Sequence, residues 1–376
     1  MVDKGILLSV RGLKQYFGSG PYKTKAVHNI SFDVKEGECL GLVGESGCGK
    51  TTTGRTVIGL YEPTSGDIFY KGYRLAAGER DYRKEIKWST IHANEKIKEL
   101  KDTQGEAANE EIAKIREAQA KHVAETKELI KRAHFDNNHS SRRLRNEIQM
   151  IFQDPIDSLD PRMTVEDIIT EGLHIQGKYN RAENHKIVCD ALIKVGLIPD
   201  YAARYPHEFS GGQRQRIGIA RALVMNPKFL ICDEPISALD VSIRAQILNL
   251  LNEIKENMNL TMLFIAHDLS VVKYFCDRIA VMYFGNMVEL ASSDELFRHP
   301  LHPYTKALLS AIPKPDPKSE KNRLRHTYNP KEVHDYSKGA PTFRELLPGH
   351  FVLCNDAEEE AYRKEIASID DMKEGE

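Results

Sequence analysis

Short apolar runs, separated by glycine-rich and charged segments, set the pattern of this chain. Residues 6–16 and 26–34 alternate between apolar and polar positions, as strands with one exposed face do. Residues 39–43, 228–232 and 261–266 are short apolar runs that suit strands buried on both faces. The order of these runs predicts an α/β fold that begins with a small antiparallel β subdomain.

Helical patterns fill much of the remaining chain. Residues 50–60 follow a glycine-rich break and can form a helix, and residues 162–223 have mainly helical patterns. We therefore expect a main domain over residues 1–285, with a helical subdomain at about residues 155–222.

Residues 81–139 differ in composition from the segments around them. Glu, Lys, Ala and Gln dominate, Ile and Leu recur sparsely at helical spacing, and the Asp-Thr-Gln-Gly sequence at residues 102–105 is a turn signal. This pattern predicts a charged helical hairpin inserted into the main domain. Two interpretations remain open: a solvated surface hairpin without chemistry, or an arm that docks a partner.

The end of the chain has a different character again. Beyond Gly285 proline and charged residues become frequent, and an acidic stretch begins at Asp356. This composition predicts a small C-terminal extension over residues 286–376 whose acidic end is loose.

The overall composition excludes several classes of protein. The chain has 376 residues, 41% of them apolar, which is enough for a sizeable core and excludes a disordered protein. A formal net charge of −2 gives no global basic field for nucleic acid or anionic lipid. The longest apolar runs, such as residues 260–266, are too short to span a bilayer, and the N-terminus has no signal-peptide pattern. We therefore expect a protein that stays in the cytoplasm.

The sequence GESGCGKT at residues 44–51 fits the phosphate-loop pattern at every fixed position. Its glycines let backbone N–H groups approach phosphates, and the following helix directs its positive end at the same anion. Lys50 can reach the β- and γ-phosphates, and the Thr51 hydroxyl can ligate Mg²⁺. The residues expected to bind ATP here are Gly44, Glu45, Ser46, Gly47, Cys48, Gly49, Lys50, Thr51 and Thr52.

A second apolar run ends in two carboxylates, Asp233 and Glu234. An Asp at the C-terminal end of a parallel strand beside a phosphate loop is placed to hold Mg²⁺ through water. Glu234 would project toward the γ-phosphate, where it can orient and deprotonate the attacking water. In isolation such a run is more often a strand entering a turn, and the phosphate loop favours the functional interpretation.

A serine and two glycines precede a further predicted helix, in the motif Ser210, Gly211, Gly212 and Gln213. Hydroxyl and backbone donors at this position can bind an anion. Alone, the motif is more often an ordinary helix N-cap.

Taken in order, these motifs resemble those of the ABC ATPase family. The phosphate loop, Gln153, residues 209–213, the Asp233–Glu234 pair, residues 237–240 and His267 follow one another as they do in that family. The Ser-Gly-Gly-Gln motif matches the family signature, with Phe209 where leucine is usual, at a position that packs rather than binds. The resemblance implies a P-loop NTPase core and two ATPase subunits that dimerise head to tail, the signature of one closing on the ATP of the other.

The resemblance also implies roles for single residues. Gln153 would contact Mg²⁺ and the attacking water, His267 would contact the γ-phosphate, and Asp240 would shape the dimer interface. The adenine ring is expected to stack on Phe17, with Tyr16 as the alternative. The implied catalytic residues are Glu234, His267, Gln153 and Lys50, and the implied Mg²⁺ residues are Thr51, Gln153 and Asp233.

One branch of the family fits best. Residues 151–155 and 158–163 are similar to the peptide and nickel importers, in particular the F-type ATPase subunit of oligopeptide or dipeptide permeases, and residues 299–313 to their C-terminal extension. This similarity implies peptide import driven by ATP hydrolysis at the cytoplasmic face of the cell membrane. The implied partners are a second, homologous ATPase subunit, two transmembrane permease subunits and, indirectly, an extracytoplasmic solute-binding protein; no nucleic acid is implied.

The chain departs from this branch in two places. The hairpin at residues 81–139 is longer than the usual connection, although it leaves every motif intact. Some relatives hold an iron–sulfur cluster with a C-terminal group of cysteines, whereas only Cys354 lies in that region here. Because one thiolate cannot hold such a cluster, we expect none. The six scattered cysteines, none in a Cys-x-x-Cys pair, are expected to be reduced thiols.

Other functions remain open at this level. A soluble ABC ATPase that acts on DNA or ribosomes shares these motifs, and the hairpin could then serve as its arm. An importer of nickel or another small solute is a second alternative. A regulatory subunit that binds ATP without hydrolysis is a third, against which the intact Glu234 and His267 argue.

Overall fold

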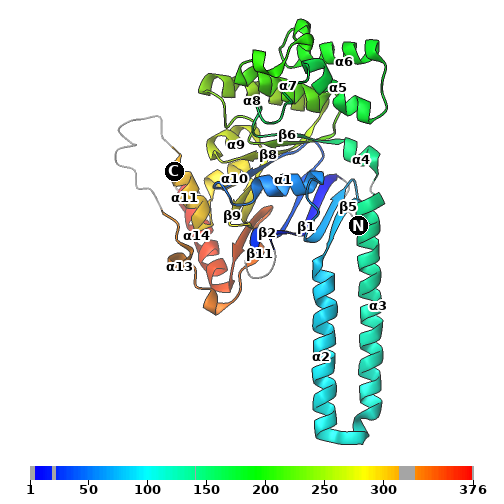
Figure 1. Ribbon diagram of the computed structural model, residues 1–376. Coiled ribbons are helices and arrows are strands. Elements are labelled where there is room, and N and C mark those ends of the chain that lie inside the picture. The colour runs from blue at the N-terminus through cyan, green and yellow to red at the C-terminus, as the bar shows by residue number, and fades with distance from the viewer. Residues whose placement is uncertain (1–4, 19–22, 140, 313–326, 375–376) are drawn as a thin grey trace.

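A computed structural model describes residues 5–18, 23–139, 141–312 and 327–374. Two sheets form its centre (Figure 1). The smaller sheet is antiparallel with the order β2-β1-β4-β5, and it contains both of the alternating runs predicted as strands. Its strands are β1 (Ile6–Phe17), β2 (Thr24–Lys35), β4 (Ser65–Tyr70) and β5 (Tyr73–Glu79).

The larger sheet has eight strands in the order β11-β12-β10-β9-β3-β8-β7-β6. Strands β9, β3, β8, β7 and β6 are parallel, whereas β10, β12 and β11 continue the sheet in antiparallel register. Every residue of β3, β7 and β8 is buried, as their apolar runs predict. The strands are β3 (Cys39–Val43), β6 (Ile148–Ile151), β7 (Phe229–Asp233), β8 (Thr261–Ala266), β9 (Arg278–Tyr283), β10 (Asn286–Ser292), β11 (Thr342–Leu347) and β12 (His350–Cys354).

Two apolar clusters hold these layers together. One lies between the two sheets, where helix α1 (Lys50–Ile58) packs, and includes Leu8, Leu42 and Ile265. The other joins the opposite face of the large sheet to the helices, and includes Ile169, Ile217 and Phe264. The helices on this second side include α8 (Val241–Met258), α9 (Leu269–Phe275) and α10 (Ser293–Arg298).

A helical layer covers one end of the large sheet, at the top of Figure 1. It consists of α5 (Val165–Ile175), α6 (Arg181–Lys194), the short turns Pro199–Ala203 and Pro206–Glu208, and α7 (Gly211–Leu223). Thr164 and Ser210 begin α5 and α7 with reciprocal capping boxes. Phe209, just before α7, is buried against Tyr201 with ring centroids 5.2 Å apart, so it packs in the core.

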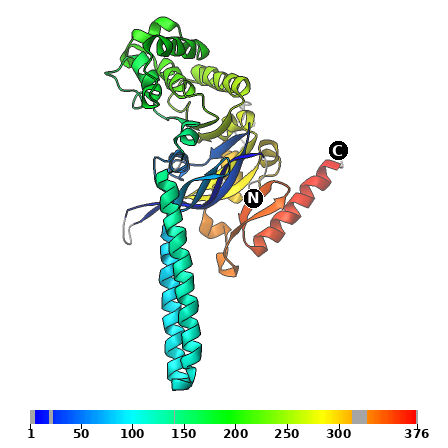
Figure 2. The ribbon, with the colours of Figure 1, turned by 90° about the vertical axis from the view of Figure 1, so that its right-hand side faces the viewer.

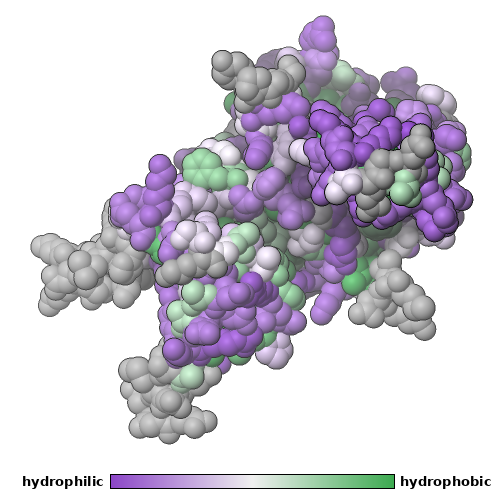
Figure 3. Space-filling view, turned by 90° about the horizontal axis from the view of Figure 1, so that it is seen from below, coloured by the Kyte–Doolittle hydropathy of each residue, from purple (hydrophilic) through white to green (hydrophobic). Residues whose placement is uncertain are grey.

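The charged insertion forms two long helices, α2 (Arg80–Gln104) and α3 (Asn109–His139), joined by the turn Gly105–Ala108. The pair projects away from the sheets, and its far end has a mostly hydrophilic surface (Figures 1, 2 and 3). Its base is fixed to β5, because Asn137 exchanges side-chain hydrogen bonds with the Ala77 backbone and Arg74 pairs with Asp136. A short helix, α4 (Arg142–Asn146), returns the chain to β6.

The first part of the acidic stretch packs against the large sheet, which composition did not predict. Residues Asp356–Glu374 form helix α14, whose Tyr362 and Ile366 are buried against Leu346 of β11 and Val352 of β12. Lys306 of α11 (Pro303–Ala311) pairs with Glu365 at 2.6 Å. Apolar burial on one face of the helix therefore outweighs the repulsion among its acidic residues.

The expected boundary at residue 285 falls in the turn between β9 and β10, two paired strands of one sheet. The hairpin β11–β12 extends that same sheet by pairing with β10. Two short helical turns, Pro330–Val333 (α13) and Tyr336–Lys338, precede the hairpin. Within the described ranges no helix combines the length and the apolar content needed to cross a membrane.

Candidate nucleotide-binding site

The phosphate loop connects β3 to α1 and depends on glycine at defined positions. Gly44, Gly47 and Gly49 have positive φ angles of 148°, 82° and 107°. A Cβ atom on Gly49 would lie 2.1 Å from the carbonyl oxygen of Ala26 on β2. Backbone strain and this close approach together exclude larger residues, because an L side chain rarely adopts such angles.

The Lys50 side chain is buried and turns back across the loop. Its Nζ atom donates hydrogen bonds to the carbonyl oxygens of Gly44 at 2.7 Å and Glu45 at 2.9 Å. The Sγ atom of Cys48 lies 3.8 Å from the same ammonium group. Burial raises the pKa of the Cys48 thiol, although Lys50 opposes that shift. The loop therefore holds one cation beside a thiol that stays protonated.

Thr51 and Asp233 connect the loop to the end of β7. The Thr51 hydroxyl donates to Oδ1 of Asp233 at 2.8 Å, and the Asp233 side chain is 0% exposed. Burial raises the pKa of Asp233, while the Thr51 hydrogen bond and the charge of Arg55 lower it. Oδ2 of Asp233 has no hydrogen-bond partner among the described residues. A buried carboxylate oxygen without a partner, next to a hydroxyl, fits a hard divalent cation such as Mg²⁺.

Three polar side chains meet above this pair. Glu234 follows β7 with a φ of 44°, and its backbone N–H donates to the Ile265 carbonyl at 3.0 Å. Its Oε2 atom accepts a hydrogen bond from Nε2 of Gln153 at 3.2 Å and lies 3.3 Å from Nδ1 of His267. The left-handed conformation, unusual for a glutamate, directs the carboxylate toward the loop side of the sheet.

These groups line one cavity of about 210 Å³. Residues from the loop, from the ends of β7 and β8, and from the segment after β6 converge there, although they are far apart in the sequence. The lining residues are Ala26, Ser46, Gly47, Gly49, Lys50, Thr51, Thr52, Gln153, Glu234 and His267. Ala26 carries no chemical signal in the sequence, because it meets the loop through its backbone carbonyl.

Several residues expected to bind nucleotide lie outside this cavity. The motif Ser210–Gln213 is at the exposed start of α7, where Ser210 and Gln213 bond to each other, and Asp240 is exposed before α8. Phe17, 38% exposed, meets Tyr61 edge-on at a centroid distance of 5.3 Å, whereas the Tyr16 hydroxyl is bonded to the His28 ring. Tyr61, which the sequence interpretation did not include, is therefore the immediate aromatic neighbour of the expected adenine platform.

Known proteins match nearly all of this chain. Residues 27–136 and 120–237 match the ABC transporter family model, and residues 288–344 match the model of the oligopeptide/dipeptide transporter C-terminal region. The oligopeptide transport ATP-binding protein OppF of Bacillus subtilis is 48% identical over 358 residues, which cover 95% of this chain and 98% of that protein. The oligopeptide transport ATP-binding protein AmiF of Streptococcus pneumoniae is 45% identical over 359 residues, with the same coverage.

Solved structures agree on the fold. The structure of cbiO1 from Clostridium perfringens, part of an ABC transporter complex, is similar with a TM-score of 0.53 and 24% identity, over 79% of this chain and 92% of that one. The ATP-binding cassette MJ0796, solved as a dimer bound to ADP and Pi, has the same TM-score at 22% identity, over 76% of this chain and 99% of its own. The predicted P-loop NTPase core is thus confirmed, and the chain belongs to the family of ABC transporter ATP-binding proteins.

Proposed function

We propose that this protein is the subunit that binds and hydrolyses ATP to energise the import of oligopeptides through an ABC transporter. The single observation that carries the proposal is the cavity lined by Lys50, Thr51 and the Gln153–Glu234–His267 group, with the buried Asp233 bonded to Thr51. The peptide substrate is supported by relatives with 45–48% identity that are named oligopeptide transport ATP-binding proteins.

The loop and Lys50 would bind the triphosphate. Backbone N–H groups of residues 46–51 and the start of α1 favour an anion, and the Lys50 ammonium can move from the loop carbonyls to the β- and γ-phosphates. The adenine ring would stack on Phe17 beside Tyr61. Binding in this form needs no covalent chemistry, because phosphoryl transfer is catalysed mainly by positioning and charge.

Thr51 and Asp233 would hold Mg²⁺, with Gln153 nearby as a further oxygen ligand. When bound, Mg²⁺ neutralises charge on the phosphate oxygens. Glu234 would accept the proton of the attacking water, and Gln153 and His267, both within 3.3 Å of its carboxylate, would keep that carboxylate directed at the γ-phosphate.

The exposed signature and Asp240 are consistent with a site that is completed by a second subunit. In the proposed head-to-tail dimer, Ser210–Gln213 of a homologous ATPase would close on the nucleotide bound here. Closure would be transmitted to two transmembrane permease subunits at the cytoplasmic face of the membrane. An extracytoplasmic solute-binding protein would deliver the peptide to those subunits.

The test compares purified wild-type protein with Glu234→Gln. We expect wild-type affinity for Mg-ATP and a fall in hydrolysis of about 10²–10⁴-fold, which is the usual contribution of a general base. Glu360→Gln, an exposed carboxylate on α14, is the matched control and should keep full activity. Hydrolysis by Glu234→Gln at the wild-type rate would refute Glu234 as the base, and wild-type protein without affinity for Mg-ATP would refute the function itself.

The transport step needs a separate experiment. The native complex is isolated from detergent-solubilised membranes, its subunits are identified, and candidate solutes are tested for stimulation of ATP turnover. Stimulation by oligopeptides in the presence of permease subunits and binding protein is the expected result. Recovery of the chain with ribosomes or DNA and without permease subunits would instead support a soluble ABC ATPase.

A further inference from the structure

A hydrogen bond joins the phosphate loop to the C-terminal part of the chain. The backbone N–H of Glu45 donates a hydrogen bond of 3.0 Å to the hydroxyl of Tyr304, which lies 259 residues later on α11. Tyr304 is 2% exposed, and its ring packs on Tyr283 at the end of β9 with centroids 4.5 Å apart. The hydroxyl therefore has little freedom to move away from the loop.

Glu45 is held at both of its peptide groups. Its carbonyl oxygen accepts hydrogen bonds from Lys50 Nζ at 2.9 Å and from the backbone N–H of Cys48 at 3.3 Å, while Tyr304 takes its N–H. If Lys50 turns to a bound phosphate, it gives up its bond to this carbonyl. The proposed site binds phosphate through the N–H groups of residues 46–51, so the bond from the Glu45 N–H to Tyr304 can persist while nucleotide is bound.

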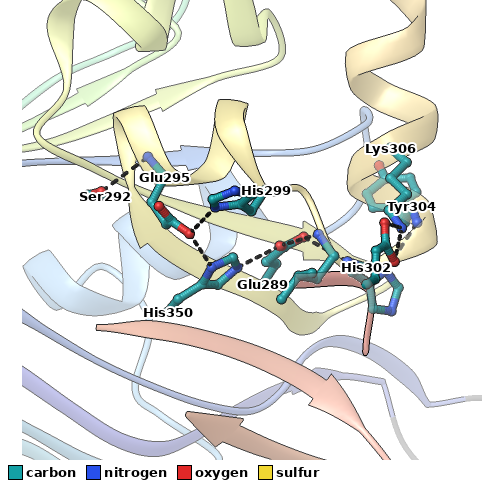
Figure 4. Close-up of polar contacts among 10 residues, drawn as sticks. Glu289, Ser292, Glu295, His299, His302, Tyr304, Lys306 and His350 are labelled. Carbon is teal, nitrogen blue, oxygen red and sulfur yellow. Dashed lines mark hydrogen bonds and ion pairs between the residues drawn. The ribbon is translucent and has the colours of Figure 1, made fainter. Parts of the chain in front are cut away.

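Buried polar contacts in turn fix the start of α11 (Figure 4). The Nδ1 atom of His302 caps the helix by accepting from the Tyr304 N–H at 3.1 Å. The buried carboxylate of Glu289 on β10 accepts from the N–H groups of Leu301 at 2.8 Å and His302 at 3.1 Å. The same carboxylate bonds to Nε2 of His350 on β12 at 2.8 Å, and both side chains are 0% exposed.

These contacts form a continuous path from β12 through Glu289 and α11 to the phosphate loop. We propose that Tyr304 is a positioning residue for the nucleotide site, through which the C-terminal extension fixes the conformation of the loop. The inference rests on the proposed function, because it assigns Tyr304 to the same site. Tyr304 does not touch the nucleotide in this scheme, and it acts through the Glu45 backbone.

The expected effect follows from the loss of one neutral hydrogen bond. Without the hydroxyl, Glu45 loses its acceptor and the loop samples conformations that do not bind phosphate. The apparent dissociation constant rises in inverse proportion to the fraction of molecules whose loop can bind phosphate. A net hydrogen bond of ordinary strength corresponds to about a three- to tenfold change in an equilibrium constant.

The test uses full-length Tyr304→Phe, which keeps the ring that packs on Tyr283. Tyr283→Phe is the matched control, because it removes a neighbouring hydroxyl that has no hydrogen bond to the loop in the described structure. We expect the Kd for Mg-ATP to rise about three- to tenfold in Tyr304→Phe, with kcat at saturating ATP and the Tm close to those of Tyr283→Phe. An unchanged Kd, or an equal rise in both variants, would overturn the proposal.

A second readout is independent of nucleotide. The Cys48 thiol lies in the loop and is buried, so its alkylation by N-ethylmaleimide, quantified by peptide mass spectrometry, reports opening of the loop. Alkylation of Cys48 should be several-fold faster in Tyr304→Phe than in Tyr283→Phe, about in line with the change in Kd. Equal alkylation rates in the two variants would overturn the role of Tyr304, even if the wild type binds Mg-ATP. If the two variants differ in rate but the wild type binds no Mg-ATP, the proposed function alone is refuted.

Discussion

The Thr51 hydroxyl donates a 2.8 Å hydrogen bond to Asp233, and this contact joins the first turn of α1 to the end of β7 across 182 residues of sequence. It leaves the second carboxylate oxygen of Asp233 buried and without a described partner. Burial of a carboxylate oxygen without a partner costs free energy, so the arrangement favours a cation at that oxygen. In the proposed site the pair would therefore link the binding of Mg²⁺ to the geometry of the loop.

Thr51→Val tests this link. The substitution keeps the shape of the side chain and removes the hydroxyl, so we expect the affinity for Mg-ATP to fall by about 10–100-fold while the affinity for ATP in EDTA stays nearly unchanged. Isothermal titration with and without Mg²⁺ measures both values. Thr56→Val on the same helix is the control, since Thr56 donates to the Thr52 carbonyl and lies outside the cavity. An equal loss with and without Mg²⁺ would contradict a metal-binding role.

Gly49→Ala tests the close approach of the loop to β2. The new Cβ would lie 2.1 Å from the Ala26 carbonyl oxygen, and the residue would keep a φ of 107°. We expect the free energy of unfolding to fall by about 2–4 kcal/mol, measured by urea denaturation without nucleotide. Gly47→Ala is the matched control because its φ is also positive but no atom lies within 4 Å, so it should lose only about 1 kcal/mol. If both variants lost the same free energy of unfolding, the close approach to Ala26 would not be the cause of the loss in Gly49→Ala.

The sequence predicts those parts of the site whose functional residues lie next to one another in the chain. The phosphate loop and the Asp233–Glu234 pair are recognisable because a strand, a turn and a few defined side chains are contiguous in the chain. The Tyr304–Glu45 contact was not predicted, since nothing near residue 304 specifies a partner 259 residues earlier. The pairing of β12 with β10 was missed for the same reason.

The packing of α14 on the sheet was missed for a different reason. Composition weighs all residues of α14 alike, whereas its packing depends on Tyr362 and Ile366, which are four residues apart and lie on one face. Because the other faces of the helix are charged, the average hydropathy of the segment is low and does not reveal this apolar pair.

Tyr362→Ala tests the packing of α14. Removing a large buried ring from the cluster with Leu346 and Val352 should cost about 3–5 kcal/mol and release the helix from the hairpin. Limited proteolysis should then cut within residues 356–374 much faster than in the wild type. Glu360→Ala, at an exposed position of the same helix, should change stability by less than about 0.5 kcal/mol and leave the cleavage rate as it is. Rapid cleavage of the wild type itself would show that the helix is loose in solution.

His302 predicts a specific pH dependence of stability. Burial lowers the pKa of His302 to about 3, and the neighbouring His334 and Lys306 add to the shift. The unfolded chain binds a proton at this histidine near its ordinary pKa of 6.5, whereas the folded protein does not. The contribution of neutral His302 is therefore fully present above pH 6.5 and is lost as the pH falls toward about 3, by up to about 1.4 kcal/mol for each pH unit.

His302→Asn removes this titration and keeps a side chain that can cap α11. The free energy of unfolding, measured between pH 7 and pH 4, should fall less steeply with pH in this variant. The difference between the two slopes should approach the value expected when unfolding takes up one proton fewer per molecule. His207→Asn, an exposed histidine, should keep the wild-type slope. If wild type and His302→Asn lost stability in parallel, His302 would have to be protonated in the folded protein, and its burial could not be the cause of acid sensitivity.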